Sequence, residues 1–521
     1  MNRAQFRRKA SPIATRVPRL ALLVSVLACS DAPSGGVAPP STPSATAVVS
    51  PRNIIFILSD DEDVGIHAFL PKTKALLHDQ GTTLTNFFVT YSLCCPSRAS
   101  ILRGQYPHNT LVESNGGPGG GYLRFKTLGR EQATIGTWLQ QAGYRTVFIG
   151  KYMNGYDIST AGPAPPGWNQ WNGVLNDSTI NRGYNYRTDE DGVIVSYGSA
   201  PADFLTDMIA RKATAAIRQA ALDKVPLFLY LAPVSPHLPA GWAPRHAGLF
   251  TATPLPISPN YNEKNVSDKP AAIRSLPLLG STALSSLTSD YRSRLRSLQS
   301  VDDLVDSVVT TLKKARVLDK TWIFYTSDNG FHMGAHRSRS GKNLPYEEDL
   351  RVPFVVRGPG VTRGKVVPEI GLNIDLAATF AEIAGAAPTV PQDGRSLLPL
   401  LTSAAPAGWR LSFQIERGAQ DLAWISSREG QLHPQLEEGD VAAAGFPGLG
   451  WNAIRSSRWK YVEWANGDRE LYDLVADPYE LNNLFFIKGD TSAAPLLMTR
   501  LHQLMTCSGS SCALLEDLPV P

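Results

Sequence analysis

The segment from Asn53 to Ser59, NIIFILS, constrains the fold of this chain more than any other feature of its sequence. Its five central residues are all apolar, without the polar alternation of a half-exposed strand, so the segment predicts a strand that is buried on both faces. Strands of this kind occur in parallel sheets that helices cover on both sides. Two carboxylates, Asp60 and Asp61, follow directly where this strand ends.

Strand and helix patterns continue to alternate along the chain. Further strands are predicted at Arg145–Gly150, Pro226–Ala232 and Thr321–Thr326. Helices are predicted near Thr73–His78 and at Ala133–Ala142, Phe204–Leu222 and Tyr291–Ala315. The segment Val352–Arg357 and the helix Asp375–Ala384 close the domain. This alternation predicts a parallel α/β sheet whose functional site lies along the carboxyl edge of the strands.

The first 50 residues predict export of the protein. Six basic residues precede the apolar run Leu20–Ala28, which is too short to span a bilayer, so residues 1–29 are predicted to be a signal peptide. The run ends in VLAC, which looks like a bacterial lipobox with Cys29 as the lipidated N-terminus; ordinary cleavage after a small residue is the alternative. Residues 30–50, rich in Ser, Pro, Ala and Gly, predict a flexible linker.

The folded part divides into two predicted domains. Residues 51–394 form the predicted catalytic domain, and a shift toward Pro, Gly and Trp after Gly394 predicts a smaller C-terminal domain over residues 395–521. The patterns WKYVEW and GDRELYD within it predict a hairpin. We expect the protein in the cell envelope of a bacterium, lipid-anchored or periplasmic, or secreted, with a lipid on Cys29 as its one link to the membrane.

The charge of the chain limits the classes of partner that it can bind. The 50 Lys and Arg against 46 Asp and Glu give a net charge of +4 without long blocks of one sign, so nothing indicates a nucleic-acid partner.

Five cysteines are too few for a disulfide scaffold. Cys507 and Cys512 can close a short loop in an oxidising compartment or remain thiols, whereas the adjacent Cys94 and Cys95 would form a strained ring and need another explanation.

Acidic turns after two predicted strands indicate a metal site. Asp60 and Asp61 follow one strand, and Asp328 and Asn329 follow another. If these strands are neighbours, the oxygen ligands converge, and such ligands suit calcium or magnesium, not zinc or copper. Close carboxylates repel one another, so a cation would hold them together. Taken alone, Asp60-Asp61 would be read as a helix cap or a solvated turn.

The segment from Cys94 to Arg98, CCPSR, resembles the CxPSR signature of type I sulfatases. The resemblance extends over roughly residues 51–485, and the most similar varieties are the N-acetylglucosamine-6-sulfatase-like and arylsulfatase-like ones. The motifs that carry it are NIIFILSDDED, SLCCPSRASILRGQYPHN, GKYMNGY, PVSPHLP, SVDDLVDSVV, IFYTSDNGFHMG and ELYDLVADPYELNNL. It implies an alkaline-phosphatase-like α/β fold, with a large mixed, mostly parallel sheet flanked by helices and a smaller α+β C-terminal domain.

The resemblance also implies a cofactor and a metal. Cys94, not Cys95, would be oxidised to formylglycine by a separate formylglycine-generating maturation enzyme. Asp60, Asp61, Asp328 and Asn329 match ligands of one calcium ion, and residue 94 would complete that set.

Five further residues match groups that bind or protonate the substrate. Arg98 matches an arginine beside formylglycine and the metal, although a structural salt bridge is the alternative; Lys151 and Lys342 match lysines that hold the sulfate oxygens. His237 matches a histidine that contacts sulfate and can protonate the leaving oxygen, with a loop histidine capped by backbone as the alternative. His332, followed by His336, is expected to line the same pocket.

Two positions depart from the family pattern. Met153 stands where many sulfatases have a histidine after the lysine of the GK motif, which leaves the base of the reaction unassigned. Arg103 stands where a threonine is common, in a stretch that guides the maturation enzyme.

The sequence thus predicts an enzyme that hydrolyses sulfate esters of a sugar or an aryl alcohol. One alternative is a phosphodiesterase or phosphonate hydrolase of the wider alkaline-phosphatase superfamily, which shares the fold. The other is a surface protein that binds sulfated glycans without catalysis, for which a modifiable cysteine at residue 94 would be unnecessary.

Overall fold

The computed structural model of the chain describes residues 52–176, 180–403, 406–418, 449–488 and 493–521. The predicted signal peptide, Cys29 and the linker lie outside these residues. Contacts between Cα atoms separate residues 1–50 from the rest, and only the unit that begins at Pro51 is described below. Within the described ranges, no helix is both long enough and apolar enough to cross a membrane.

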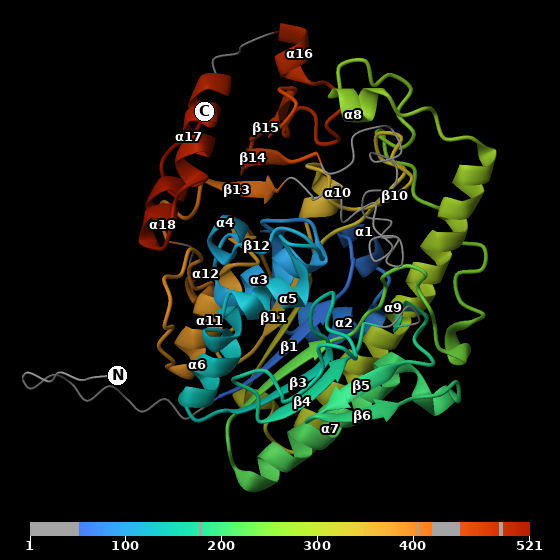
Figure 1. The fold of residues 1–521 in the computed structure, drawn as a ribbon, viewed down its shortest axis with the longest axis vertical. Coiled ribbons are helices and arrows are strands. Elements are labelled where there is room, and N and C mark those ends of the chain that lie inside the picture. Colours follow the sequence, from blue (N-terminus) through green and yellow to red (C-terminus); the bar gives the residue numbers. More distant parts are fainter. Residues whose placement is uncertain (1–51, 177–179, 404–405, 419–448, 489–492) are drawn as a thin grey trace, which may run out of the picture. The chain divides into compact units, whose positions relative to one another are not determined.

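A ten-stranded sheet forms the centre of this unit (Figure 1). Five adjacent strands, β8, β1, β7, β3 and β4, run parallel, and β12 and β2 form a parallel pair further out. Strands β11, β5 and β6 run antiparallel to their neighbours, so the sheet is mixed and mostly parallel, as predicted. In spatial order the strands are β12 (Lys365–Leu372), β2 (Thr82–Phe88), β11 (Phe354–Arg357), β8 (Thr321–Ser327), β1 (Asn53–Ser59), β7 (Leu227–Ala232), β3 (Arg145–Lys151), β4 (Gln170–Val174), β5 (Arg187–Glu190) and β6 (Val193–Ser196).

Strand β1 is buried on both faces because helices cover both sides of the sheet. Its alternate side chains Ile54, Phe56 and Leu58 enter one hydrophobic core, whereas Ile55 and Ile57 enter another. The first core lies against α3 (Cys94–Arg103), α5 (Gly121–Thr127), α6 (Ile135–Gln141), α11 (Asp375–Ala384) and α12 (Leu398–Thr402). The second lies against α7 (Leu205–Asp223) and α9 (Ser281–Lys314).

The remaining helices and the smallest sheet lie in the connections. Strands β9 (His332–Met333) and β10 (Ser340–Gly341) form an antiparallel pair. The short helices are α1 (Val64–His67), α2 (Pro71–Thr73), α4 (Pro107–Thr110), α8 (Ala271–Arg274) and α10 (Glu347–Leu350).

A separate antiparallel sheet belongs to the C-terminal part of the chain. Its order is β13 (Ser412–Arg417), β14 (Trp451–Ser456), β15 (Trp459–Trp464) and β16 (Arg469–Asp473), followed by α16 (Leu484–Lys488), α17 (Ala494–Leu504) and α18 (Ser510–Glu516). The predicted hairpin is the β15–β16 pair. Cys507 and Cys512 form a disulfide bond. This sheet and α17 share a hydrophobic core with the ends of β2 and β12.

Three predictions about elements need correction. Helix α9 begins ten residues earlier than the predicted Tyr291, at Ser281, because the added turns are mostly polar and carry no clear apolar period. The segment ending at Arg357 runs antiparallel within a sheet that the alternation had indicated to be parallel. Strands β4, β5, β6 and β12 were not predicted; β5 and β6 are short and partly exposed.

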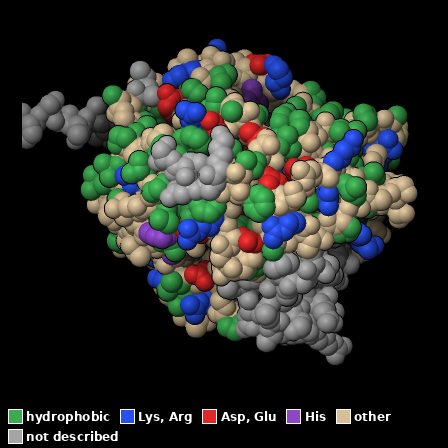
Figure 2. Space-filling view, turned by 90° about the horizontal axis from the view of Figure 1, so that it is seen from above, with side chains coloured by type: hydrophobic (Ala, Val, Ile, Leu, Met, Phe, Trp, Pro, Cys, Tyr) green, Lys and Arg blue, Asp and Glu red, His purple; other side chains and the backbone are tan. Residues whose placement is uncertain are grey.

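Charged side chains are mixed on the surface. Figure 2 shows Lys and Arg scattered among Asp and Glu over the face that it draws, without one continuous basic field there.

Candidate active site at the carboxyl edge of the sheet

Four adjacent parallel strands, in the order β8, β1, β7 and β3, end at the same edge and supply most of the site. Asp60 and Asp61 follow β1, Asp328 and Asn329 follow β8, His237 lies five residues beyond β7, and Lys151 is the last residue of β3. The backbone N–H of Asp61 donates a hydrogen bond to Oδ1 of Asp328 at 3.1 Å, so the two acidic turns meet.

Cys94 is brought to this edge as the first residue of helix α3. The helix is buried along its whole length, which fixes its start against the sheet. The Cys94 Sγ atom lies 3.5 Å from Oδ1 of Asp60, 2.8 Å from Nζ of Lys342 and 3.4 Å from Nζ of Lys151. Burial raises the pKa of the Cys94 thiol well above its ordinary value, although the two lysines act in the opposite direction.

The neighbouring thiol points elsewhere. Cys95 Sγ accepts a hydrogen bond from the backbone N–H of Asn154 at 3.2 Å and belongs to the hydrophobic core on the α3 side of the sheet. Met153, the position that departs from the family pattern, is buried in the same core. The first cysteine of the pair therefore contacts the acidic turns, while the second packs in the core.

Arg98 lies one helical turn after Cys94 on the same face of α3 and is almost completely buried. Its Nε donates to Asp328 at 2.8 Å and one terminal nitrogen donates to the backbone carbonyl of Lys151 at 2.7 Å. The other terminal nitrogen is buried without a hydrogen-bond partner among the described residues. Burial opposes the charge, but Asp328 and Asp60 outweigh it and raise the pKa of Arg98.

The two lysines pair with the two adjacent carboxylates. Lys151 Nζ lies 2.5 Å from Asp60 Oδ2, and Lys342 Nζ lies 2.5 Å from Asp61 Oδ1. Burial alone would raise the pKa values of both aspartates, but the neighbouring cations lower them below the ordinary value. The carboxylates are therefore ionised at neutral pH and the site is densely charged. Lys342 reaches this position because it directly follows β10, which pairs with β9.

Four side chains at this edge place possible metal-ligand atoms close together. Ligand atoms of Asp60, Asp61, Cys94 and His237 all lie within 4.8 Å of one another. The Asn329 side chain donates to Asp61 Oδ1 at 2.8 Å, while its own Oδ1 is buried without a partner among the described residues. A buried acceptor without a donor is costly, and a cation beside these carboxylates would supply its missing contact.

His237 is held by its backbone-facing nitrogen. Nδ1 lies 2.6 Å from the carbonyl oxygen of Leu238 and 3.0 Å from the Asn181 amide, while Nε2 lies 3.6 Å from Asp61 Oδ2. The carbonyl contact requires a proton on Nδ1, which leaves Nε2 toward the acidic turns. Asn181 had no signal in the sequence, because it lies in a short 3-10 helix, Ile180–Arg182, far from any motif.

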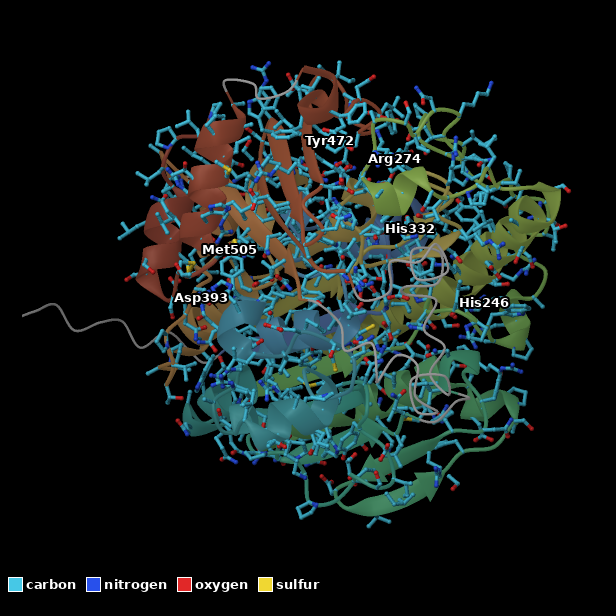
Figure 3. All side chains as sticks on the ribbon, turned by 45° about the horizontal axis from the view of Figure 1, so that its top comes forward. His246, Arg274, His332, Asp393, Tyr472 and Met505 are labelled. Carbon is cyan, nitrogen blue, oxygen red and sulfur yellow. A yellow bond between two sulfur atoms is a disulfide. The ribbon has the colours of Figure 1, made fainter. Side chains whose placement is uncertain are left out.

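The structure separates the two histidines that follow the Asp328 turn. His332, labelled in Figure 3, lies in β9 opposite Gly341, beside Lys342, and its Nδ1 contacts Asp349 at 2.8 Å. His336 is fully buried and contacts Glu263 at 2.6 Å and the ring of Tyr346. None of these partners of His336 belongs to the acidic turns, so its expected place in the pocket is not supported by these contacts.

Sequence reasoning missed two residues that hold the site together. Arg294 is buried in α9, donates to the backbone carbonyl of Asp61 and pairs with Asp63 at 3.0 Å. Asp349 accepts from the backbone N–H of Leu344 as well as contacting His332. The signal for Arg294 was its position on the apolar face of a helix, whereas Asp349 stands among other acidic residues and had none.

Known proteins place this arrangement in context. The Sulfatase family matches residues 52–386 of the chain. An arylsulfatase of Volvox carteri is 34% identical over 90% of this chain and 77% of its own length. The human N-acetylglucosamine-6-sulfatase is 32% identical over 88% of this chain and 85% of its own length. The solved structure of BT4656 in complex with its substrate, D-glucosamine-2-N,6-O-disulfate, superposes with a TM-score of 0.70 and 24% identity, over 87% of this chain and 97% of that one.

Proposed function

This chain belongs to the sulfatase family, enzymes that hydrolyse sulfate esters, and we propose that it does so with a formylglycine made from Cys94 beside one bound Ca²⁺. The observation that carries the proposal is the position of the Cys94 Sγ atom, which contacts a carboxylate and two lysines at the edge where the acidic turns meet. A separate maturation enzyme would have to oxidise this cysteine.

The cofactor would supply the reacting group. A hydrated formylglycine carries two hydroxyls on one carbon, one to attack sulfur and one to release sulfate afterwards. The residues around position 94 would orient these hydroxyls: Lys151 and Lys342 contact the side chain at 94, and Asp60 lies within reach of it. Because Met153 is buried in the core, we assign no role in proton removal to it.

Four residues would hold the cation. We propose that Asp60, Asp61, Asp328 and Asn329 bind it through side-chain oxygens, as calcium prefers. When bound, the ion would neutralise the carboxylates and stabilise negative charge near residue 94. Arg294 would keep the Asp61 turn in place from behind, through the backbone carbonyl.

The cations of the site would bind the sulfate group. One terminal nitrogen of Arg98 makes no hydrogen bond among the described residues and lies 3.8 Å from Asp60 Oδ2, and Lys151 and Lys342 both contact residue 94. Fixed positive charges near the reacting atoms stabilise the charge that develops on the sulfate oxygens. Arg98 would also keep Asp328 in position through its Nε.

Two histidines would serve the leaving alcohol. His237 has Nδ1 held by a backbone carbonyl, so its Nε2 is oriented, and in the doubly protonated imidazolium it can give a proton to the leaving oxygen. We propose that His332, whose Nδ1 is held by Asp349 in the same manner, contacts the leaving group from the side of Lys342.

A sugar is the substrate class that we favour. Asn154 and Asn181 are amides with a buried oxygen that lacks a partner among the described residues, and they neighbour the Lys151 and His237 segments. Hydroxyl groups of a sugar could satisfy them, whereas an aryl ring could not. The relatives named N-acetylglucosamine-6-sulfatase agree with this choice. Export, with or without a lipid on Cys29, is part of the same proposal.

Two cysteine variants test the proposal. Cys94→Ala should abolish turnover of an aryl sulfate, while Cys95→Ala, the matched control, should keep it within a few-fold, because the Cys95 thiol contacts the Asn154 backbone and packs in the hydrophobic core. Mass spectrometry of the peptide containing residue 94 should find the mass of formylglycine in the wild-type protein and in the control.

Retained turnover in Cys94→Ala would contradict the mechanism. Removal of Ca²⁺ with a chelator should lower the activity and its return should restore it. Faster turnover of aryl phosphate or phosphonate esters than of aryl sulfate, with manganese preferred, would instead favour the hydrolases of the wider superfamily.

A further inference from the structure

A polar groove lies on the outer side of helix α9, away from the reacting residues. It has a volume of about 350 Å³ and is lined by Thr251, Ser285, Thr288, Ser289, Arg292 and Arg296. Five of these residues lie on α9 at helical spacing, so they share one face of the helix. The sixth belongs to the loop that packs against α9, in which His246, labelled in Figure 3, contacts Asp303 of the helix at 3.1 Å.

The two arginines of this groove are fixed but not neutralised. Arg292 donates through Nε to the carbonyl of Thr253 at 2.8 Å, and Arg296 donates through Nε to the carbonyl of Leu249 at 2.7 Å. The Arg296 guanidinium also lies over the ring of Trp242, 5.1 Å from its centre. These contacts use one nitrogen of each guanidinium and leave the two terminal nitrogens for another acceptor.

Nearby carboxylates are already engaged with other cations. Asp207 pairs with Arg245 at 2.7 Å, and Asp303 contacts Arg245, Lys72 and His246. Two cations four residues apart on a helix repel each other, so the alignment of Arg292 and Arg296, which pair with no carboxylate among the described residues, opposes the stability of the helix. A ligand with more than one negative charge would relieve this repulsion.

We propose that this groove binds a sulfated polysaccharide chain at a second site, distinct from the residues around Cys94. Planar guanidinium groups with two free nitrogens match the oxygens of a sulfate group, and the hydroxyls of Ser285, Thr288 and Ser289 match those of a sugar. The lining residues include no aromatic ring for stacking, which single-stranded nucleic acid would use. The choice of a glycan over another polyanion rests on the proposed sulfatase function.

The same helix connects this groove with the reaction site. Arg294, between the two groove arginines in sequence, points inward and donates to the backbone carbonyl of Asp61. The groove is therefore separated from the acidic turn by about one helix diameter, on the order of 10 Å. A long sulfated substrate bound there would be retained near the site without a contact to the bond that is cleaved.

The test measures binding separately from hydrolysis. In a Cys94→Ala background, the Kd for a chemically sulfated hexasaccharide is measured at low salt with Arg292→Gln/Arg296→Gln and with the control Arg211→Gln/Arg218→Gln. The control removes the same charge from exposed positions of α7. We expect the groove variant to bind about tenfold more weakly and the control to bind like the parent.

A second pair of variants avoids the loop contacts of the arginines. Ser285→Glu/Ser289→Glu places acids on exposed groove positions and should also weaken binding, unlike Ala215→Glu on α7. With Cys94 intact, kcat/KM for a small aryl sulfate should be unchanged in all four variants. Equal Kd values for groove and control variants would overturn the proposal, as would an equal loss of affinity for an oligonucleotide of the same charge. Failure of the sulfatase proposal itself would appear separately, as absent turnover of the aryl sulfate.

Discussion

Asp349 controls the orientation of His332 although it had no signal in the sequence. Its two oxygens lie 2.8 and 3.0 Å from His332 Nδ1, and one of them also accepts from the backbone of Leu344 at 2.7 Å. An amide in its place can accept with one atom only, so it cannot serve both His332 Nδ1 and the Leu344 N–H, and its NH2 group would face one of these two donors. We expect Asp349→Asn to lower kcat for a sulfate ester on the order of 10- to 100-fold, measured by steady-state kinetics.

The neighbouring residue supplies the control for this prediction. Glu348→Gln removes the same charge from a side chain that accepts a hydrogen bond from Asn260 at 2.8 Å. It should keep nearly the wild-type kcat. Equal losses in the two variants would mean that Asp349 acts through the general charge of the segment and not through the histidine.

Residues of the site could be predicted from the sequence where a motif or the end of a strand marks them. Asp60, Lys151 and Asp328 each adjoin a strand end, so their meeting follows from a parallel sheet. Residues that support these groups could not be predicted, since Arg294 and Asn181 reach the site across more than fifty residues of chain. Their partners depend on packing, which no local pattern encodes.

At the scale of elements, the close approach of β3 and β7 at Gly150 leaves no room for a side chain at that position. Gly150 has a φ of 127°, and a Cβ atom there would lie 2.1 Å from the carbonyl oxygen of Ala232. The backbone of β7 cannot yield cheaply, and the next residue is Lys151. We expect Gly150→Ala to lower the free energy of unfolding by more than about 3 kcal/mol, measured by denaturant unfolding, and to impair activity.

Substitution of Gly143 is the control, because it carries the conformational cost of a positive φ without the steric clash. It also has a positive φ, 87°, but a Cβ atom there would meet nothing within 4 Å. Gly143→Ala should therefore cost only about 1–2 kcal/mol, the penalty for the left-handed backbone. Similar unfolding midpoints for the two variants would show that the close approach of the strands does not contribute to the loss of stability in Gly150→Ala.

The elements that the sequence predicts well are those with a clear pattern of apolar residues. Strand β1 and helix α11 have the predicted bounds, because an unbroken apolar run and an amphipathic pattern are each specific. The first ten residues of α9 and the strands β5 and β6 were missed. The first turns of α9 and strand β5 are largely polar, and β6 is a mostly exposed apolar segment of four residues, so tertiary contacts decide their conformation.

At the scale of the whole molecule, His108 links the α/β part to the C-terminal sheet. Its Nδ1 lies 2.9 Å from Glu416 of β13, and Nε2 lies 3.0 Å from the carbonyl of Cys507. Burial opposes protonation, but the contact with Glu416 outweighs it and raises the pKa of His108 from 6.5 to about 9. The charged histidine therefore stabilises the fold fully below pH 6.5, and this contribution is lost as the pH rises through 9.

A variant isolates this pH dependence. Gln at position 108 can keep a hydrogen bond but does not titrate, so the difference in unfolding free energy between wild type and His108→Gln should shrink between pH 6.5 and 9, by an amount on the order of 2 kcal/mol. Urea unfolding at several pH values measures it. A difference that stays constant over this range would contradict the pairing of His108 with Glu416.

The division of the folded chain at residue 394 stays a prediction, although the change in composition there does precede a separate sheet. What joins that sheet to the rest could not be read from the sequence. His108 and Glu416 lie 308 residues apart, and no pattern in the sequence indicates that they contact each other.

The central position of β1 has a consequence for how the protein is made. One of its two neighbours, β8, pairs Thr321 with Asn53, 268 residues earlier in the chain. On the ribosome, β1 must wait for that neighbour for roughly 10–50 s at ordinary translation speeds. Cys94 is fully enclosed once folding is complete. Under the proposed function, the maturation enzyme would therefore have to meet Cys94 while the chain is still unfolded, before β8 docks beside β1.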